Sequence, residues 1–136
     1  MGLTRILATF WVVTVCAHGA SPLECVSKLR LPTYDSLARQ AQITGEGAVK
    51  IQLGVDGEVA HQEILASHPL LERDLKRAVE QMHFFDRCAK QTLEFKFTFE
   101  FSGEPSRDKG LVITFEYPDH FVLSVSPPVV KVQIDD

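Results

Sequence analysis

Residues 93–101 read Leu-Glu-Phe-Lys-Phe-Thr-Phe-Glu-Phe, and this stretch decides the fold. Large apolar residues occupy every odd position, and polar residues occupy every even one. A helix cannot place all five apolar side chains on one face, whereas a strand places residues i, i+2 and i+4 on the same side. The pattern therefore predicts a half-buried strand with one face in the core and the other in water.

Upstream, two strands joined by a tight turn are predicted. Residues 48–53 alternate apolar and polar side chains, and Asp56-Gly57 is a strong hairpin signal. The returning strand, residues 58–66, is less regular. Its apolar side chains share one face only if a bulge intervenes, unless the far end of the strand is covered on both sides.

A short helix is predicted over residues 34–43, where apolar residues recur at helical spacing and Asp35 or Thr33 can cap the start. A break at residues 44–47 separates this helix from the first strand of the hairpin, because Gly45 and Gly47 disfavour helix. The sequence thus predicts one short helix before the hairpin.

A longer amphipathic helix is predicted over residues 69–84. Ser67 is the expected N-cap and Pro69 lies just inside the start. The inward stripe contains one polar exception, Asp74, which is expected at the margin of the stripe. Its length suits packing across one face of the sheet. The apolar positions of the stripe are Leu71, Leu75, Ala78, Val79 and Met82.

The two ends of the chain are predicted to be less regular. Residues 21–33 form an extended lead-in, because Pro22 and Pro32 disfavour helix. After a loop at residues 102–110, alternation returns at 111–117, a turn fits Pro118-Asp119, and residues 121–125 complete a hairpin. Residues 129–136 are expected to form an edge segment or a loose tail.

Composition limits the classes of function. The 136 residues suit one domain, and the formal net charge is −4. Lys and Arg are scattered, whereas nucleic-acid binding needs clustered positive charge. We therefore expect no nucleic-acid partner.

Residues 1–20 have the layout of a secretory signal peptide. Arg5 precedes an apolar run at residues 6–17, and small residues follow at Ala17, Gly19 and Ala20, each a candidate cleavage point. The run is shorter than the stretch of about 20 residues that spans a bilayer. We expect a periplasmic or secreted protein, with an uncleaved inner-membrane anchor or a lipid tether at Cys16 as alternatives.

Export to an oxidising compartment changes how the cysteines are interpreted. Removal of Cys16 with the signal leaves Cys25 and Cys88, an even pair in an oxidising compartment, so a disulfide is predicted. The alternative is two unrelated thiols. A redox-active pair is disfavoured because no Cys-x-x-Cys motif is present.

The sequence does not indicate an enzyme, a metal site or a cofactor. No Gly-x-Ser-x-Gly motif places a serine beside a base, and the histidines are dispersed. His61 and Glu63 share a strand face, but an exposed polar pair is a more common reading than two metal ligands. Gly45-x-Gly47 precedes a strand rather than opening a helix, which excludes a phosphate loop.

Taken in order, the segments of residues 31–101 resemble the TonB C-terminal domain family, the periplasmic module that engages outer-membrane receptors. In place of the aromatic-basic-aromatic motif and following proline that family members usually carry near the second helix, this chain has Met82-His83-Phe84. The resemblance rests on Tyr34-Asp-Ser-Leu37-Ala38-Arg-Gln-Ala41-Gln-Ile43, Gly45-x-Gly47, the strand at residues 48–53, Val55-Asp56-Gly57-Glu58-Val59, Ile64-Leu-Ala-Ser67, His68-Pro-Leu70-Leu71 and the inward positions of the second helix.

The resemblance implies an α+β fold for residues 34–101: a small antiparallel sheet of three core strands with two helices, to which residues 102–136 add a loop, a C-terminal β-hairpin and a tail. It also implies a non-enzymatic module that binds an extended segment of an outer-membrane TonB-dependent receptor or other envelope protein. In the family, the strand after the second helix takes this segment. Here the flanking polar residues of that peptide-binding edge are Glu94, Lys96, Thr98 and Glu100. The alternative is a secreted structural or accessory domain whose edge is closed by its own residues 111–125.

Overall fold

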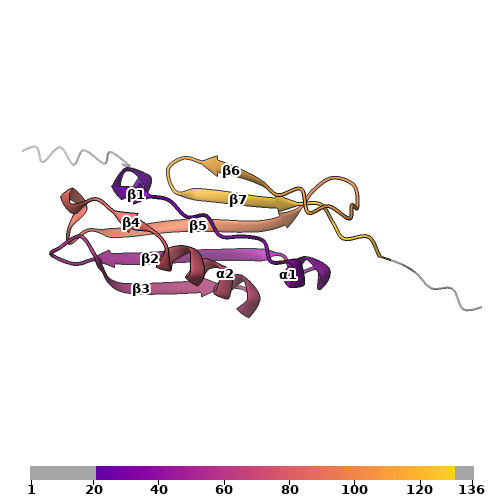
Figure 1. Ribbon diagram of the computed structural model, residues 1–136, viewed down its shortest axis with the longest axis horizontal. Helices are drawn as coiled ribbons and strands as arrows, with labels where there is room; N and C mark the ends of the chain where they lie inside the picture. The colour runs from indigo at the N-terminus through magenta and orange to yellow at the C-terminus, as the bar shows by residue number, and fades with distance from the viewer. Residues whose placement is uncertain (1–20, 131–136) are drawn as a thin grey trace, which may run out of the picture.

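The computed structural model describes residues 21–130 (Figure 1). The predicted signal peptide and residues 131–136 of the predicted tail lie outside this range. The elements in chain order are η1 (Pro22–Cys25), β1 (Val26–Lys28), α1 (Ser36–Gln40), β2 (Gly45–Leu53), β3 (Val59–Ala66), α2 (Pro69–Glu80), β4 (His83–Phe84), η2 (Asp86–Cys88), β5 (Thr92–Phe101), β6 (Val112–Glu116) and β7 (His120–Val125).

The main sheet has five strands in the order β3-β2-β5-β7-β6. Neighbouring strands are antiparallel except for β5 and β7, which run parallel. The predicted α+β class is confirmed, and the predicted C-terminal hairpin is present as β6 and β7. The three predicted core strands, β3, β2 and β5, pair antiparallel as expected, and the added hairpin joins β5 in parallel, so the whole sheet is mixed. The chain leaves β5, returns along the outer position as β6, and then fills the space between them with β7.

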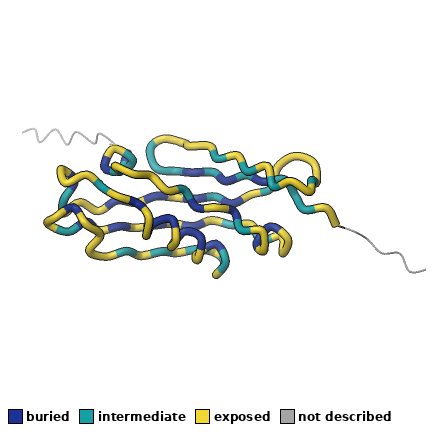
Figure 2. Tube along the Cα trace, in the orientation of Figure 1, coloured by how far each residue is buried: buried dark blue, intermediate teal, exposed yellow. Residues whose placement is uncertain are grey.

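Strand β5 has the predicted alternation. Leu93, Phe95, Phe97 and Phe99 are buried, while the even-numbered residues are exposed or half-buried. Buried and exposed positions alternate along the strand (Figure 2). Phe97 stacks on Phe121 of β7 with ring centroids 5.5 Å apart. The inward face of β5 is thus the centre of a core shared with both neighbouring strands.

The hairpin of β2 and β3 contains a bulge, one of the two alternatives that the sequence left open. It brings Val59 and Ile64 to the inner face, while Leu65 lies on the outer face. Gln52 pairs with His61, but Leu53 pairs with Val59, so Ala60 is an extra residue on β3. Strand β2 begins at Gly45, earlier than predicted, because the glycines pair with β5. Gly47 also lets α2 approach, since an added Cβ would lie 2.4 Å from Leu75 Cδ1.

Helix α2 covers the inner face of the sheet next to β2 and β3 (Figure 1). It ends at Glu80, earlier than predicted, because His83 and Phe84 form β4 and pair with β1. Its N-cap is His68, whose Nδ1 accepts a hydrogen bond from the Leu70 N–H at 3.1 Å. Ser67 was the expected cap, but its Oγ accepts from the Glu46 N–H and joins β3 to β2.

The N-terminal segment is more ordered than an extended lead-in. It forms η1 and then β1, which pairs with β4 in a separate two-stranded sheet. Helix α1 is shorter than predicted, and its cap is Asp35. Tyr34 lies outside the helix because its side chain fills the core, where its hydroxyl donates to the Ile43 carbonyl and burial raises its pKa to about 12.

Asp74 lies inside the fold, whereas the sequence placed it at the margin of the helix stripe. It is 3% exposed, and its carboxylate accepts a hydrogen bond from the Asp35 N–H at 3.2 Å. Burial raises the pKa of Asp74, and the Asp35 carboxylate adds to this effect, against the lowering by the Asp35 N–H and by Arg73 and Arg77. The carboxylate therefore ties α2 to the start of α1 at a cost in solvation.

The fold should accordingly be more stable to unfolding when Asp74 is protonated. A raised folded-state pKa favours folding below the unfolded-state pKa, and this contribution is lost as pH rises through the folded-state pKa. The Asp74→Asn variant keeps an acceptor for the Asp35 N–H, so its free energy of unfolding relative to wild type should rise from pH 4 to pH 7. Urea unfolding at several pH values measures this difference, with Glu72→Gln on the exposed face of α2 as control. A relative stability that falls with pH would contradict the prediction.

Arg39 fastens the C-terminal segment to α1. The side chain is only 8% exposed, and its guanidinium donates to backbone carbonyls rather than to a carboxylate. Nε donates to Ser126 at 2.7 Å, and the terminal nitrogen reaches Pro127, Asp108 and Ser106. Arg39 thereby holds the loop after β5 against the segment after β7.

The Arg39→Met variant should unfold more easily by about 2–3 kcal/mol, because charge-assisted hydrogen bonds are lost and several carbonyls lose a partner. Urea unfolding measures the loss. Arg107→Met is the matched control, since Arg107 is exposed in the same loop. Equal stability of the two variants would contradict a fastening role for Arg39.

Candidate functional site

The four residues of the predicted peptide-binding edge lie together on the outer face of β5, the face opposite α2. Over residues 96–101, however, β7 pairs with the side of β5 that lies away from β2. The chain's own hairpin therefore occupies the edge at Lys96, Thr98 and Glu100, as in the closed-edge alternative. Of the four residues, only Glu94 lies on the part of β5 that β7 leaves uncovered.

The uncovered part of the edge is residues 92–95. The Lys96 N–H donates to the Asp119 carbonyl at 2.9 Å, and the Gln91 carbonyl accepts from the Leu53 N–H on the other side of the strand. Because backbone groups alternate in direction along a strand, the even positions of β5 point away from β2. The N–H and C=O groups of Thr92 and Glu94 therefore point past the start of β7.

A polar recess of about 1040 Å³ adjoins this uncovered part of β5. Its walls come from η1, from η2 and from the turn between β6 and β7. Ser21 Oγ donates to the Pro118 carbonyl at 2.5 Å and links the first of these walls to the last. Three segments that are distant in sequence thus meet beside one strand edge.

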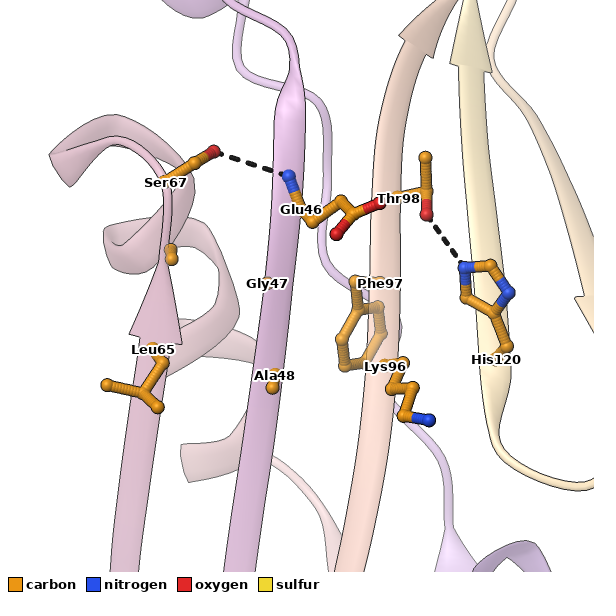
Figure 3. A pocket seen from close by; sticks show the side chains of 10 residues that line it. Glu46, Gly47, Ala48, Leu65, Ser67, Lys96, Phe97, Thr98 and His120 are labelled. Carbon is orange, nitrogen blue, oxygen red and sulfur yellow. Dashed lines mark hydrogen bonds between the residues drawn. The ribbon is translucent and has the colours of Figure 1, made fainter.

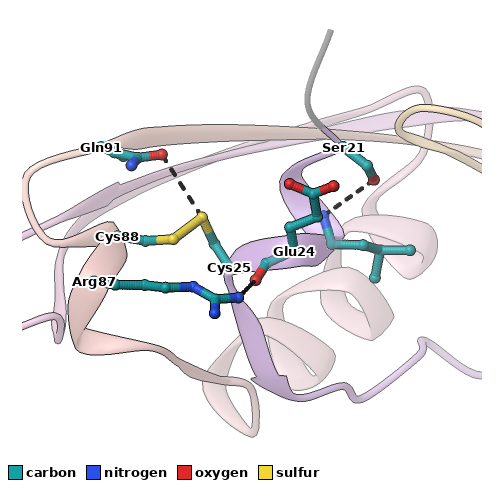
Figure 4. The surroundings of a disulfide bond; sticks show 7 residues. Ser21, Glu24, Cys25, Arg87, Cys88 and Gln91 are labelled. Atoms are coloured by element: carbon teal, nitrogen blue, oxygen red, sulfur yellow. Dashed lines mark hydrogen bonds between the residues drawn. A yellow bond between two sulfur atoms is a disulfide. The ribbon is translucent and has the colours of Figure 1, made fainter. Parts of the chain in front are cut away.

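The predicted disulfide between Cys25 and Cys88 is present and forms part of this recess (Figure 4). The S–S distance is 2.07 Å, and the Cα atoms are 5.7 Å apart. Both cysteines are buried, so the bond fixes η1 to η2. Arg87 strengthens the link by donating to the Glu24 carbonyl at 2.6 Å and lying 4.6 Å from the centroid of the Phe85 ring.

Charges of both signs line the recess. Lys50 and Glu94 face each other at 3.8 Å across the sheet. Among residues 21–130, the carboxylates of Glu24 and Asp119 have no ion-pair partner. Arg87 also lines the recess without an ion-pair partner among these residues, so the recess retains two acidic groups and one basic group for the charged side chains of a ligand.

A second hollow, of about 490 Å³, lies on the outer face of the sheet (Figure 3). It exists because the small side chain of Ala48 lies between Leu65 on β3 and Lys96 on β5. Leu65 is 64% exposed and forms an apolar wall. An adjacent hollow of about 260 Å³ shares these three residues and continues along β2.

A chain of hydrogen bonds borders the outer-face hollow. His120 Nε2 lies 2.7 Å from Thr98 Oγ1, and His120 Nδ1 lies 2.9 Å from Glu116 Oε2. The sequence did not predict this grouping, because it requires the parallel register that sets His120 opposite Lys96. The order of hydroxyl, imidazole and carboxylate resembles an acyl-transfer relay. Acyl transfer also needs free N–H donors beside the hydroxyl, whereas the backbone around Thr98 is committed to sheet pairing on both sides.

His61 and Glu63 project from the outer face of β3, as predicted, opposite Gln52 and Lys50. Within the described residues, no three histidine, cysteine or acidic side chains gather where they would hold a metal ion. None of the helices in residues 21–130 has the length and apolar character needed to cross a bilayer. A scan against protein-family models gave no match, and a search of curated proteins gave none either.

The variant in which Cys25 and Cys88 are both replaced by Ala should lose about 4 kcal/mol of stability, because the bond closes a loop across 63 residues. Urea unfolding with and without reductant measures the effect, and reduced wild type should match the variant. Intact mass before and after reduction checks the bond itself, because reduction of one disulfide adds two hydrogen atoms to the mass of the protein. An unchanged mass would contradict a disulfide in the isolated protein.

Proposed function

We propose that the protein is an exported, non-enzymatic interaction module that binds an extended segment of another envelope protein, as the resemblance to the receptor-engaging domain of TonB implies. The observation that carries the proposal is the pair of backbone positions, Thr92 and Glu94, that point into the recess beside the disulfide. Support also comes from α1, β2, β3, α2 and β5, which follow in the order expected from the resemblance.

Backbone pairing explains how the recess would bind a ligand. An extended segment would enter in line with β7 and add to β5 next to residues 92–95. Strand addition gains affinity from main-chain hydrogen bonds and specificity from alternate side chains. A Lys or Arg of the segment would lie near Glu24 and Asp119, the two acidic groups without an ion-pair partner.

The disulfide suits an oxidising compartment, which agrees with the proposed signal peptide at residues 1–20. In that setting the binding partner is a segment of an outer-membrane transporter or of another envelope protein. The walls of the recess are tied together by the Cys25–Cys88 bond and by Ser21, so the site is held open before a ligand arrives.

A second candidate is a structural or accessory domain with its edge closed by the hairpin. The burial of Phe121, Leu123 and Val125 in the core favours it, because a partner strand would have to replace this apolar surface to enter at residues 96–101. Removal of residues 104–136 should therefore unfold the protein under either function. Binding in the recess needs no such removal and remains compatible with the hairpin.

Peptides tiled across the periplasmic segments of outer-membrane transporters test the proposal on the mature protein. We expect a bound peptide to perturb the amide resonances of residues 92–95 in NMR spectra. Thr92→Pro removes one recess-facing N–H without breaking the pairing to β2, so it should weaken binding by about threefold to tenfold. Glu24→Gln combined with Asp119→Asn should weaken binding of peptides that contain Lys or Arg, and less so at high salt.

Glu100→Gln is the control, since Glu100 lies on the same face of β5 but opposite Ser124 of β7. It should bind as wild type does. Binding that perturbs other strands and ignores Thr92→Pro would place the site elsewhere. Absence of binding by every peptide, together with no capture of transporters from envelope extracts, would favour the structural alternative.

A further inference from the structure

Strand β6 forms one end of the main sheet, and within residues 21–130 its only paired neighbour is β7. On β7, the carbonyls of Asp119 and Val125 accept bonds from Lys96 and Ser102, so the odd positions of β7 point toward β5. Its even positions point toward β6, where they pair with residues 112, 114 and 116. The backbone groups of Ile113 and Phe115 therefore point away from the sheet, toward open space.

Strand β6 is five residues long and ends in Glu116, but it otherwise lacks the features that normally prevent strands from pairing. Residues 112–116 contain neither Pro nor Lys, and the register with β7 is continuous. The opposite edge strand, β3, has a bulge at Ala60 and charged or polar side chains at His61 and Glu63. Of the two ends of the sheet, β6 is thus the one open to pairing.

Apolar side chains accompany the open backbone. Val112 is 61% exposed on the outer face, and Phe115 is 38% exposed on the inner face. The Phe115 ring packs against Phe121, with centroids 4.8 Å apart. The core therefore continues to the edge of the sheet and stops there with one side of Phe115 in water.

We propose that β6 pairs with β6 of a second copy of this chain, antiparallel and centred on Thr114. Ile113 of each copy then lies opposite Phe115 of the other. Both positions point outward, so each of these two pairs exchanges two backbone hydrogen bonds. Thr114 lies opposite Thr114 of the second copy on the two-fold axis.

The side chains of this register favour a second copy as the occupant. On the inner face, Ile113 of one copy covers Phe115 of the other and extends the apolar layer. On the outer face, Thr114 meets Thr114, a favourable cross-strand pair. Glu116 lies opposite Val112, so no like charges are directly opposed. A two-fold pairing uses both open edges and closes the assembly at two copies.

A cysteine placed on the proposed axis tests the register. In Thr114→Cys, the two introduced sulfur atoms belong to a pair without backbone bonds, whose Cα atoms are about 4.5 Å apart, within the range that a disulfide bridges. Under mild oxidation the full mature protein should give a covalent dimer. Val112→Cys is the matched control on the same face, because its two copies would be about 14 Å apart in this register.

We expect Thr114→Cys to form dimer at least about tenfold faster than Val112→Cys, and this difference sets the register apart from random collision. Equal rates would overturn the proposal. Because edge pairing of this kind is weak, the dimer is expected only at high protein concentration. Sedimentation of the unmodified protein at about 100 μM should therefore show dimer. Ile113→Pro should shift it to monomer, because it removes an outward N–H and leaves the bonds to β7. A wild-type protein that stays monomeric at that concentration would overturn the proposal even if crosslinking occurred.

Discussion

The structure depends on the burial of one face of a single strand. Phe95, Phe97 and Phe99 of β5 are each almost completely removed from water, and β5 has paired neighbours on both sides. Its inward side chains contact β2, β7 and Tyr34, whose ring packs edge-on to Phe99. A shift of one residue in the pairing of β5 would move every one of these rings to the solvent face. This constraint fixes the register of both flanking strands and therefore the position of each feature on the outer face.

The same constraint explains why the C-terminal hairpin belongs to the fold. Three large rings projecting from one strand need cover beyond what β2 and α2 supply, and Phe121, Leu123 and Val125 of β7 provide it. Arg39 then holds the hairpin in place by binding the backbone at both of its ends. Parallel pairing follows because β6 occupies the outer position and β7 fills the space between. Closure of most of the β5 edge is thus a consequence of covering the core.

The local sequence pattern was sufficient to predict the features that depend only on residues close together in the chain. The alternation of residues 93–101 predicted β5, and the irregular apolar spacing of residues 58–66 left a bulge, now seen at Ala60, as one of two alternatives. The cysteine count predicted the disulfide. These features follow from the side-chain period, the turn residues and the even number of cysteines after signal removal. None of these needs knowledge of distant segments.

Features that depend on distant segments were not predictable in this way. Alternation in residues 121–125 fits a strand with any neighbour, so it could not reveal that β7 inserts beside β5. Ser67 is a favourable cap by type, yet the hairpin brings the Glu46 N–H within its reach and His68 caps the helix instead. Asp74 looks like a surface residue until the Asp35 N–H is placed against it. The recess and the His120 hydrogen-bond chain likewise depend on the parallel register of β5 and β7, which the sequence pattern does not reveal.

Unpaired backbone is the property that links the fold to interaction. The main sheet has unpaired backbone at three places, which differ in how accessible they are to another strand. Strand β3 is obstructed by its bulge and polar side chains, and β6 is bare. The start of β5 is bare but enclosed by walls that the disulfide holds in position. An enclosed edge restricts which segment can enter and in which direction, whereas a bare edge accepts any compatible strand. This difference supports the proposals that place selective recognition at residues 92–95 and self-association at β6. The two can operate together because they use the backbone of different strands, β5 and β6.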